Sequence, residues 1–248
     1  MTQALEWEGC LNVRDLGGLP TEDGRITRPG RIVRADNIRK LTDAGWQALG
    51  DHGVRRIVDL RMPVELAEDP LREVDVDVVH VSVFGDAMDE AYVADLDAHL
   101  ASVEDVADHY FYSYVDWLER YRGHFGRAFA AIADADGTVV VHCMGGKDRT
   151  GVVSALLLRL AGVPYDLIGD DYAVTAVNLE PSTSVWIPAV EDPVERAKWQ
   201  RLAATPAAAI ERVVHEIESR YGDVASYMRA AGLSDAQVTR LEERLVAP

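Results

Sequence analysis

Two scarcities narrow the function of this 248-residue chain before any motif is considered. Only two cysteines are present, Cys10 and Cys143, which is too few for a disulfide framework and fits a reducing compartment. No stretch approaches the ~20 apolar residues of a membrane span, and residues 1–10 lack an apolar signal segment. We therefore expect no integral membrane segment and, by default, a cytoplasmic location.

Positive charge is scarce as well. Lys and Arg total 25 against 42 Asp and Glu, so the formal net charge is -17, and lysine stands only at positions 40, 147 and 198. Nucleic-acid binding needs a basic face, so we expect no nucleic-acid partner. The same net charge repels anionic membranes and phosphorylated ligands at long range. Any affinity for phosphate must therefore come from local cations.

One stretch organises the rest of the chain: residues 137–151 read G-T-V-V-V-H-C-M-G-G-K-D-R-T-G. The apolar run 139–141 predicts a short strand buried on both faces of a sheet. The segment V-V-S-A-L-L-L-R-L-A that follows is apolar almost all round, which predicts a buried helix. The loop between them opens with Cys143 and closes with Arg149. This arrangement predicts a phosphate cradle with a nucleophile at its floor.

The small residues of the loop explain the cradle. Gly145 and Gly146 let the backbone curl until several N–H groups point inward at the start of the following helix, where they bind an anion. Lys147 adds a cation at the rim. The residues that we predict to bind phosphate are Met144, Gly145, Gly146, Lys147, Asp148 and Arg149.

The same field favours a cysteine anion. A free thiol has a pKa of ~8.5, which a helix N-terminus and nearby cations lower, so we expect Cys143 to be an ionised nucleophile at neutral pH. The planar guanidinium of Arg149 can hold two phosphate oxygens and follow their charge into the transition state. Thr150 is a candidate hydrogen-bond donor to the thiolate. Cys143 would attack phosphorus to give a cysteinyl-phosphate, which water then hydrolyses.

The loop has other possible interpretations, both structural and functional. A cysteine that ends a valine-rich strand is often a small core residue, but a core has no use for three charged residues in succession at 147–149. The nucleotide-triphosphate loop needs Ser or Thr after Gly-Lys, and no G-x-G-x-x-G dinucleotide fingerprint follows the strand. A catalytically silent phosphate-recognition module and a sulfurtransferase stay open as alternatives to a phosphatase. The silent module has no need of the thiol, and the charged residues fit sulfur transfer poorly.

Three segments carry a family resemblance. H-C-M-G-G-K-D-R-T-G at 142–151 resembles the loop of atypical bacterial protein-tyrosine phosphatases. N-V-R-D-L-G-G at 12–18 with R-P-G-R-I-V-R-A-D at 28–36, and R-Y-G-D-V-A-S-Y-M-R-A-A-G-L-S at 220–234, are similar to other parts of that family. Val13 stands where the family usually has Phe, and Met144 with Gly145 occupies the variable pair, so substrate preference stays open. The resemblance covers essentially the whole chain.

The resemblance implies hydrolysis of phosphotyrosine, often of phosphoserine and phosphothreonine, and in several members of phosphoinositides. The loop is also similar to that of the tumour-suppressor lipid phosphatase, in which a lysine at the position of Lys147 engages further phosphates on inositol. Some members of the family are exported without a recognisable signal, so export of this chain stays open.

The general acid is less clear. Conventional tyrosine phosphatases carry it as Asp on a W-P-D loop, and that tripeptide does not occur here. Asp148 is the first choice, in line with the family, and Asp59 and an acid from the 85–95 segment, such as Asp86, are the alternatives. No His, Cys or carboxylate cluster has ligand spacing, so we expect neither a metal nor another cofactor.

Further residues are candidates for supporting roles. Asp59 and Arg61 follow the predicted strand 56–60, and at the carboxyl end of a strand they could face the same cleft as Cys143 or form an ion pair that caps the strand. Arg14 and Asp15 match the family's opening signature and more simply fix that segment to the core. His142 and Thr150, which flank the loop, complete the set.

These patterns predict an α/β fold, with a cysteine-phosphatase-like, mostly parallel central sheet flanked by helices in a single domain over 1–248. Further strands are predicted at 31–34 and along the valines of 76–83. Helices are predicted at 42–49, within 85–122 as a lid with a capping box at Ser102 and Asp105, at 125–133, and from 165 to about 177. Residues 178–193 are predicted as a mobile loop because they carry three prolines, and 205–248 as a helical scaffold.

Overall fold

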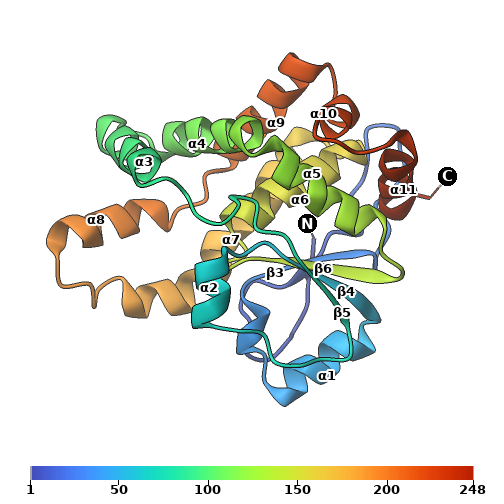
Figure 1. Cartoon of the computed structure of the whole chain (residues 1–248), viewed down its shortest axis with the longest axis horizontal. Helices are drawn as coiled ribbons and strands as arrows, with labels where there is room; N and C mark the ends of the chain where they lie inside the picture. Colours follow the sequence, from blue (N-terminus) through green and yellow to red (C-terminus); the bar gives the residue numbers. More distant parts are fainter. Residues whose placement is uncertain (1, 248) are drawn as a thin grey trace.

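The computed structural model describes residues 2–247 and contains a six-stranded sheet in the order β1-β2-β3-β6-β4-β5 (Figure 1). The four strands β3, β6, β4 and β5 run parallel, whereas β1 and β2 add antiparallel neighbours beside β3. The predicted α/β class with a mostly parallel sheet is therefore confirmed. The strands are β1 Gln3–Ala4, β2 Arg14–Asp15, β3 Ile32–Ala35, β4 Val54–Asp59, β5 Asp77–His80 and β6 Thr138–His142.

The central strand β6 is buried on both faces, as its valine run predicts. Val139 and Val141 pack into the larger apolar cluster beneath most of the helices, and Val140 packs into the smaller cluster on the opposite face. Ala35 of β3 and Asp59 of β4 both pair with His142. The carboxyl ends of three strands therefore meet at one level, directly before Cys143.

Helices cover the two faces of the sheet unequally. In Figure 1, α1 lies below the sheet, and α4, α5, α6 and α9 to α11 lie above it, while α7 and α8 extend to the left as an arm. A short 3-10 helix spans Ile38–Lys40. The α-helices are α1 Asp43–Asp51, α2 Pro63–Glu68, α3 Glu90–Ser102, α4 Val106–Arg120, α5 Arg122–Ala133, α6 Asp148–Leu160, α7 Tyr165–Trp186, α8 Pro193–Leu202, α9 Ala207–Tyr221, α10 Val224–Ala230 and α11 Asp235–Leu245.

The strand predicted along the valines of 76–83 is shorter than expected. Only β5 is extended and paired, and it is mostly exposed because it forms the edge of the sheet. Val81 and Val83 are buried, but they lie beyond the strand. The run of valines therefore overstated the length of the strand.

The excursion at 85–122 consists of two helices, and the predicted capping box is wrong. Ser102 ends α3, whereas Asp105 is itself the N-cap of α4 and accepts a hydrogen bond from the Ala107 N–H at 2.8 Å. The helix α4 packs on α9 and buries Tyr110, Tyr114 and other apolar side chains. This helix therefore belongs to the core on one face.

The prediction of a loop at 178–193 is wrong for residues 178–186, whereas residues 187–192 do connect two helices without belonging to either. The helix α7 continues through Pro181 to Trp186. Proline removes one helical N–H, but the carbonyl that loses its partner belongs to Val177, which is 73% exposed, so water can replace the bond. The next helix, α8, was not predicted, although Asp192 caps it and Pro193 stands at its first position.

The helical C-terminal part is confirmed for the residues that the structure describes. Pro206 precedes α9 as its N-cap, and Ser234 with Gln237 forms a capping box at the start of α11. Residue 248 lies outside the described residues. Between residues 2 and 247, no helix is both long enough and apolar enough to cross a bilayer.

Candidate active site

The loop of residues 143–149, called the phosphate loop below, connects β6 to α6 at the centre of the sheet. Its helix begins at Asp148, earlier than the apolar segment after Gly151 suggested. Cys143 keeps only 2% of its surface exposed and packs with the larger apolar cluster. The predicted site residues of the loop are thus consecutive on one tight turn between a buried strand and a buried helix.

Three consecutive carbonyls of the loop are bonded to groups outside it. The Met144 carbonyl accepts the N–H of Asn37 at 3.0 Å. The Gly145 carbonyl accepts a hydrogen bond from Nδ2 of Asn12 at 3.1 Å. The Gly146 carbonyl accepts one from Nη2 of Arg34 at 2.7 Å and a longer one from Asn12. The orientation of each of these peptide groups is therefore fixed by the hydrogen bond to its carbonyl oxygen.

The directions of the N–H groups in the loop follow from these carbonyl hydrogen bonds. In a trans peptide the N–H points opposite to the carbonyl of the preceding residue, so the N–H groups of residues 145–147 face the inside of the turn. Across residues 2–247, none of the N–H groups of 144–147 donates to a protein acceptor. Together with the free N–H groups at the start of α6, they form a positive concavity suited to an oxyanion.

Gly146 is required for this geometry. Its φ is +62°, in the left-handed region, and a Cβ atom there would lie 2.4 Å from the carbonyl oxygen of Ala35. Any side chain would push the loop away from β3. Gly145 has no such restriction, because its nearest neighbours lie at ordinary contact distances.

Arg149 is held by a residue that the sequence did not reveal. Glu65 of α2 accepts one N–H from each terminal nitrogen of Arg149, at 2.5 and 2.8 Å, and also caps its own helix by accepting the Met62 N–H. Burial alone would lower the pKa of Arg149, but the hydrogen bonds and charge of Glu65, and the charge of Cys143, raise it overall. Arg149 therefore stays charged.

The donors that Arg149 keeps are on one edge. Its Nε–H and the second N–H of Nη2 point the same way along the guanidinium and bond to no protein group between residues 2 and 247. This edge is a fork that can hold two oxygens of one phosphate. The side chain is 11% exposed, so such a bond would form in a largely desolvated setting.

A buried ion-pair network supports the loop from behind. Asp171 of α7 accepts Nε of Arg14 at 2.7 Å and Nη1 of Arg34 at 2.5 Å, and Arg34 in turn holds Gly146. Burial alone would raise the pKa of Asp171, but the two arginine charges outweigh it and hold that pKa well below its usual range. Through Asp171, this network joins Arg14 of β2 to α7.

Asp148 projects from the first turn of α6, with 37% of its side chain exposed. It accepts the hydroxyl of Tyr114 at 2.5 Å, and Tyr114 is bonded to the hydroxyl of Tyr172 at 2.8 Å. Burial, followed by the charge of Asp148, raises the pKa of Tyr114 well above its usual value, so this hydroxyl is a neutral donor. The α4 helix thus orients the carboxylate.

Lys147 is occupied by protein groups. Its Nζ donates to the hydroxyl of Tyr110 at 2.6 Å and to the carbonyl of Leu202, and it lies 3.4 Å from a carboxylate oxygen of Asp148. It also lies 4.5 Å from the centre of the Tyr110 ring. These contacts fix the ammonium at the rim beside Asp148.

A cavity of about 320 Å³, called the side cavity below, opens beside Lys147 and Asp148. Most of its walls are apolar or aromatic side chains from α3, α4 and α8, and its other lysine, Lys198, pairs with Asp97 at 2.7 Å. Burial and the charge of His99 lower the pKa of His109 to about 4, so this histidine is neutral at pH 7. The lining residues are Met88, Val93, Leu96, Asp97, His109, Tyr110, Ser113, Tyr114, Trp117, Lys147, Asp148, Lys198, Trp199 and Leu202.

The structure separates the other candidate acids from the side cavity. Asp59 is fully buried and holds Arg61 through both carboxylate oxygens, as an ion pair that caps β4. Burial would raise the pKa of Asp59, but the charges of His142 and Arg61 lower it overall. Asp86 is exposed and lines a separate cavity with His80 and other residues outside the phosphate loop.

The remaining predicted residues are structural in their contacts. Asp15 accepts the N–H groups of Gly17 and Gly30. His142 contacts the Cys143 carbonyl at 3.2 Å through Nδ1. The hydroxyl of Thr150 is buried and bonds to none of the described residues, so the expected hydrogen bond to Cys143 is not formed.

The supporting residues that the sequence did not single out are far from the loop along the chain. Asn12, Arg34 and Asn37 hold its carbonyls, Glu65 holds Arg149 of the loop, and Asp171 holds Arg34 behind it. Asn12 and Arg34 lie within the family-like segments 12–18 and 28–36, which was a usable signal. Glu65 and Asp171 carried no local signal.

Known proteins resemble this chain along almost its whole length. A family model described as "Tyrosine phosphatase family" matches residues 5–247. A "Tyrosine-protein phosphatase" of Nostoc commune is 32% identical over 231 residues, covering 86% of this chain and 74% of that protein. A "Triple specificity protein phosphatase PtpB" of Mycobacterium tuberculosis is 27% identical over 281 residues, covering 95% and 96% of the two chains. The resemblance seen in the sequence is confirmed: the chain belongs to the tyrosine phosphatase family and is a hydrolase of phosphate monoesters.

Proposed function

We propose that this phosphatase hydrolyses aryl phosphates, phosphotyrosine in proteins above all, with Cys143 as the nucleophile. The observation that carries the proposal is the outward bonding of three successive loop carbonyls, which leaves the N–H groups of 145–147 converging in front of β6. A thiolate at that point is stabilised by the same groups that bind the phosphate oxygens.

The two steps use groups already in place. Cys143 forms the S–P bond while the ester oxygen leaves, and the free edge of Arg149 holds two equatorial oxygens throughout. Asp148 gives its proton to the leaving oxygen and then takes one from the water that attacks the cysteinyl-phosphate. Tyr114 keeps that carboxylate turned toward the side cavity, which it lines.

The substrate class follows from the position of Asp148. An acid that protonates the leaving oxygen must lie beside the leaving group, and Asp148 lines the side cavity. That cavity is mostly apolar, and its two lysines are already bonded to protein groups. It therefore suits an aromatic ring better than an inositol carrying further phosphates.

The test is a substrate panel run with a chelator present. It compares a phosphotyrosine peptide, a phosphoserine peptide of the same sequence and a short-chain phosphoinositide. We expect kcat/KM for phosphotyrosine to exceed that for both others by about tenfold or more, because only the ring gains contact with the side cavity. A phosphoinositide rate equal to or above the phosphotyrosine rate would overturn the proposed substrate class.

The nucleophile has its own control within this panel. Cys143→Ser should lower turnover of every substrate by on the order of 10⁴-fold or more and still bind phosphate, because the loop amides and Arg149 remain. Turnover retained by this variant would remove Cys143 from the mechanism whatever the substrate preference.

We also propose a cytoplasmic location. The support is chemical, since a nucleophilic thiol works only when it is kept reduced, and the chain's two cysteines form no disulfide. Burial and the charge of Asp36 raise the pKa of the other thiol, Cys10, so it stays protonated and unreactive. Fractionation of expressing cells, with a cytoplasmic marker enzyme as reference, tests the location.

A further inference from the structure

A second concentration of positive charge lies at the opposite edge of the sheet. A cavity of about 230 Å³, called the arginine cavity below, opens where β3 and β6 begin, beneath α11. Four cations and only two carboxylates line it, in a chain whose net charge is -17. The charged lining residues are Arg28, Arg31, Arg240 and Arg244, with Asp136 and Glu243.

Three of these arginines have no carboxylate partner within residues 2–247. The guanidinium of Arg31 makes no hydrogen bond or ion pair there, although the residue is partly buried. Arg28 donates to the backbone carbonyl of Glu243 at 2.8 Å. Arg244 donates to the carbonyls of Gly137 and Ala135, and its Nε is buried without a partner. Only Arg240 pairs with an acid, Asp134.

The pKa of Arg244 reflects the same lack of carboxylate partners. Burial lowers the pKa of Arg244, and the charge of Arg31 lowers it further, against the opposing charge of Asp136. The positive charges of Arg31 and Arg244 are therefore held close together without enough carboxylates to balance them. Such an arrangement costs free energy unless an anion from solution occupies it.

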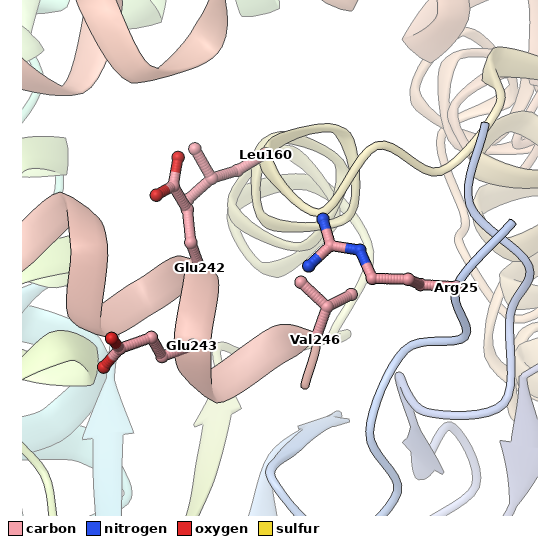
Figure 2. Close-up of a pocket in the computed structure, with 5 residues that line it drawn as sticks. All are labelled: Arg25, Leu160, Glu242, Glu243 and Val246. Carbon is pink, nitrogen blue, oxygen red and sulfur yellow. The ribbon is translucent and has the colours of Figure 1, made fainter. Parts of the chain in front are cut away.

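The neighbouring cavity on the other side of α11 lacks this excess. It has a volume of about 320 Å³, and Arg25 is its one lining cation, with Glu242 and Glu243 among the other lining residues. Arg25 is already paired with Asp23 at 2.8 Å. Figure 2 shows the carboxylate of Glu243 pointing away from Arg25. Positive charge is thus concentrated in the arginine cavity and not around α11 in general.

We propose that the arginine cavity binds a compact phosphate group, either free phosphate or the phosphate of a small monoester. Guanidinium groups match the oxygens of a tetrahedral dianion, and three arginines without acidic partners in residues 2–247 line this space, of which Arg31 has all its side-chain donors unengaged. Its volume suits a small anion, because cavities that hold larger ligands have volumes of about 300 Å³ or more.

Binding at this edge has a structural consequence. Arg31 directly precedes β3, and Arg244 holds the carbonyl of Gly137, directly before β6. At their other ends, β3 carries Arg34, which holds Gly146, and β6 leads directly into the phosphate loop. An anion bridging Arg31 and Arg244 ties the starts of both strands together and stabilises the sheet against thermal unfolding.

The test counts phosphate sites by equilibrium dialysis with radiolabelled inorganic phosphate at low ionic strength. The phosphate loop is itself a site, so we expect about two equivalents for the natural protein and about one for Arg149→Met. Arg31→Gln should lose the second equivalent or bind it at least about tenfold more weakly, because a charge-assisted bond is lost. The double variant Arg31→Gln with Arg149→Met should bind none.

Controls keep the result specific. The Arg31 side chain makes no hydrogen bond or ion pair within residues 2–247, so Arg31→Gln should fold and should keep the kcat of the natural enzyme. Arg127→Gln changes another arginine that has no carboxylate partner among the described residues, and it should leave both equivalents in place. Displacement of phosphate from the Arg149→Met protein by glycerol 3-phosphate would identify a monoester site, and its failure a site for free phosphate. Unchanged stoichiometry and affinity in Arg31→Gln would overturn the proposal.

Discussion

The two ends of the candidate active site are built differently. At the phosphate end, the ion pair between Arg34 and Asp171 that supports the loop is 1% and 2% exposed. At the cavity end, the pair between Lys198 and Asp97 that joins α8 to α3 is 25% and 49% exposed. Ion pairs of the first kind are costly to break, whereas those of the second kind contribute little.

This difference separates chemistry from substrate choice. Phosphoryl transfer depends almost entirely on holding oxygens in place, so an error of about 1 Å in the loop is costly. An apolar cavity selects by contact area and tolerates changes in its walls. We therefore expect substitutions at the phosphate end to act on stability and kcat, and substitutions at the cavity end to act on KM.

The largest effect should come from Asp171→Asn. The change leaves Arg14 and Arg34 buried without their charge partner, which costs about 3–5 kcal/mol of unfolding free energy. Denaturant unfolding at pH 7 measures it. Asp23→Asn, at an exposed pair with Arg25, is the matched control and should change little.

The ion pairs of Asp171 also make the stability of the protein depend on pH in the acid range. Because the folded-state pKa of Asp171 is depressed, its stabilisation is complete above the unfolded pKa of about 3.9 and is lost as the pH falls below it. The natural protein should therefore lose more stability between pH 5 and pH 3 than Asp171→Asn. Parallel curves for the two proteins would contradict the buried-pair account.

Arg149→Lys should lower kcat/KM by roughly 10²–10³-fold, because an ammonium cannot both pair with Glu65 and hold two phosphate oxygens. At the cavity end, Lys147→Met should lower it by no more than about tenfold. Steady-state kinetics with one aryl phosphate compares them. Equal losses would show that the two ends of the site do not differ as we describe.

Asp148→Asn probes the boundary between the two ends. Aryl phosphates with poor leaving groups should slow by about 10²-fold, and those with good leaving groups far less, because only the former need a proton from the enzyme. A plot of rate against leaving-group pKa measures the difference. A uniform loss across the series would assign the acid to another residue.

The smallest effect should come from Trp199→Ala, on the wall of the side cavity. We expect KM for a phosphotyrosine peptide to rise about three- to tenfold with kcat unchanged, through lost apolar contact. Trp199→Phe should keep most of the affinity. A fall in kcat without a change in KM would place Trp199 at the phosphate end.

The chemistry could be predicted from the sequence because it is local. Cys143 and Arg149 lie on one short turn between a valine strand and an apolar helix, and both flanking patterns can be recognised within a few residues. The supports could not be predicted, because Glu65 and Asp171 reach the loop only through tertiary packing. The α8 wall of the side cavity was missed for another reason: the prolines of 178–193 predicted a loop, but Pro193 stands at the first position of α8, where a proline loses no helical hydrogen bond.

The central claim is that Cys143 carries the phosphoryl group during turnover. It is tested most directly by mixing the enzyme with a phosphotyrosine peptide, quenching in acid within milliseconds and analysing the proteolytic fragments by mass spectrometry. The account predicts a transient phosphate adduct on Cys143 that decays as free phosphate appears and that persists longer in Asp148→Asn. Phosphate release with no adduct on Cys143, or with an adduct on another residue, would contradict it.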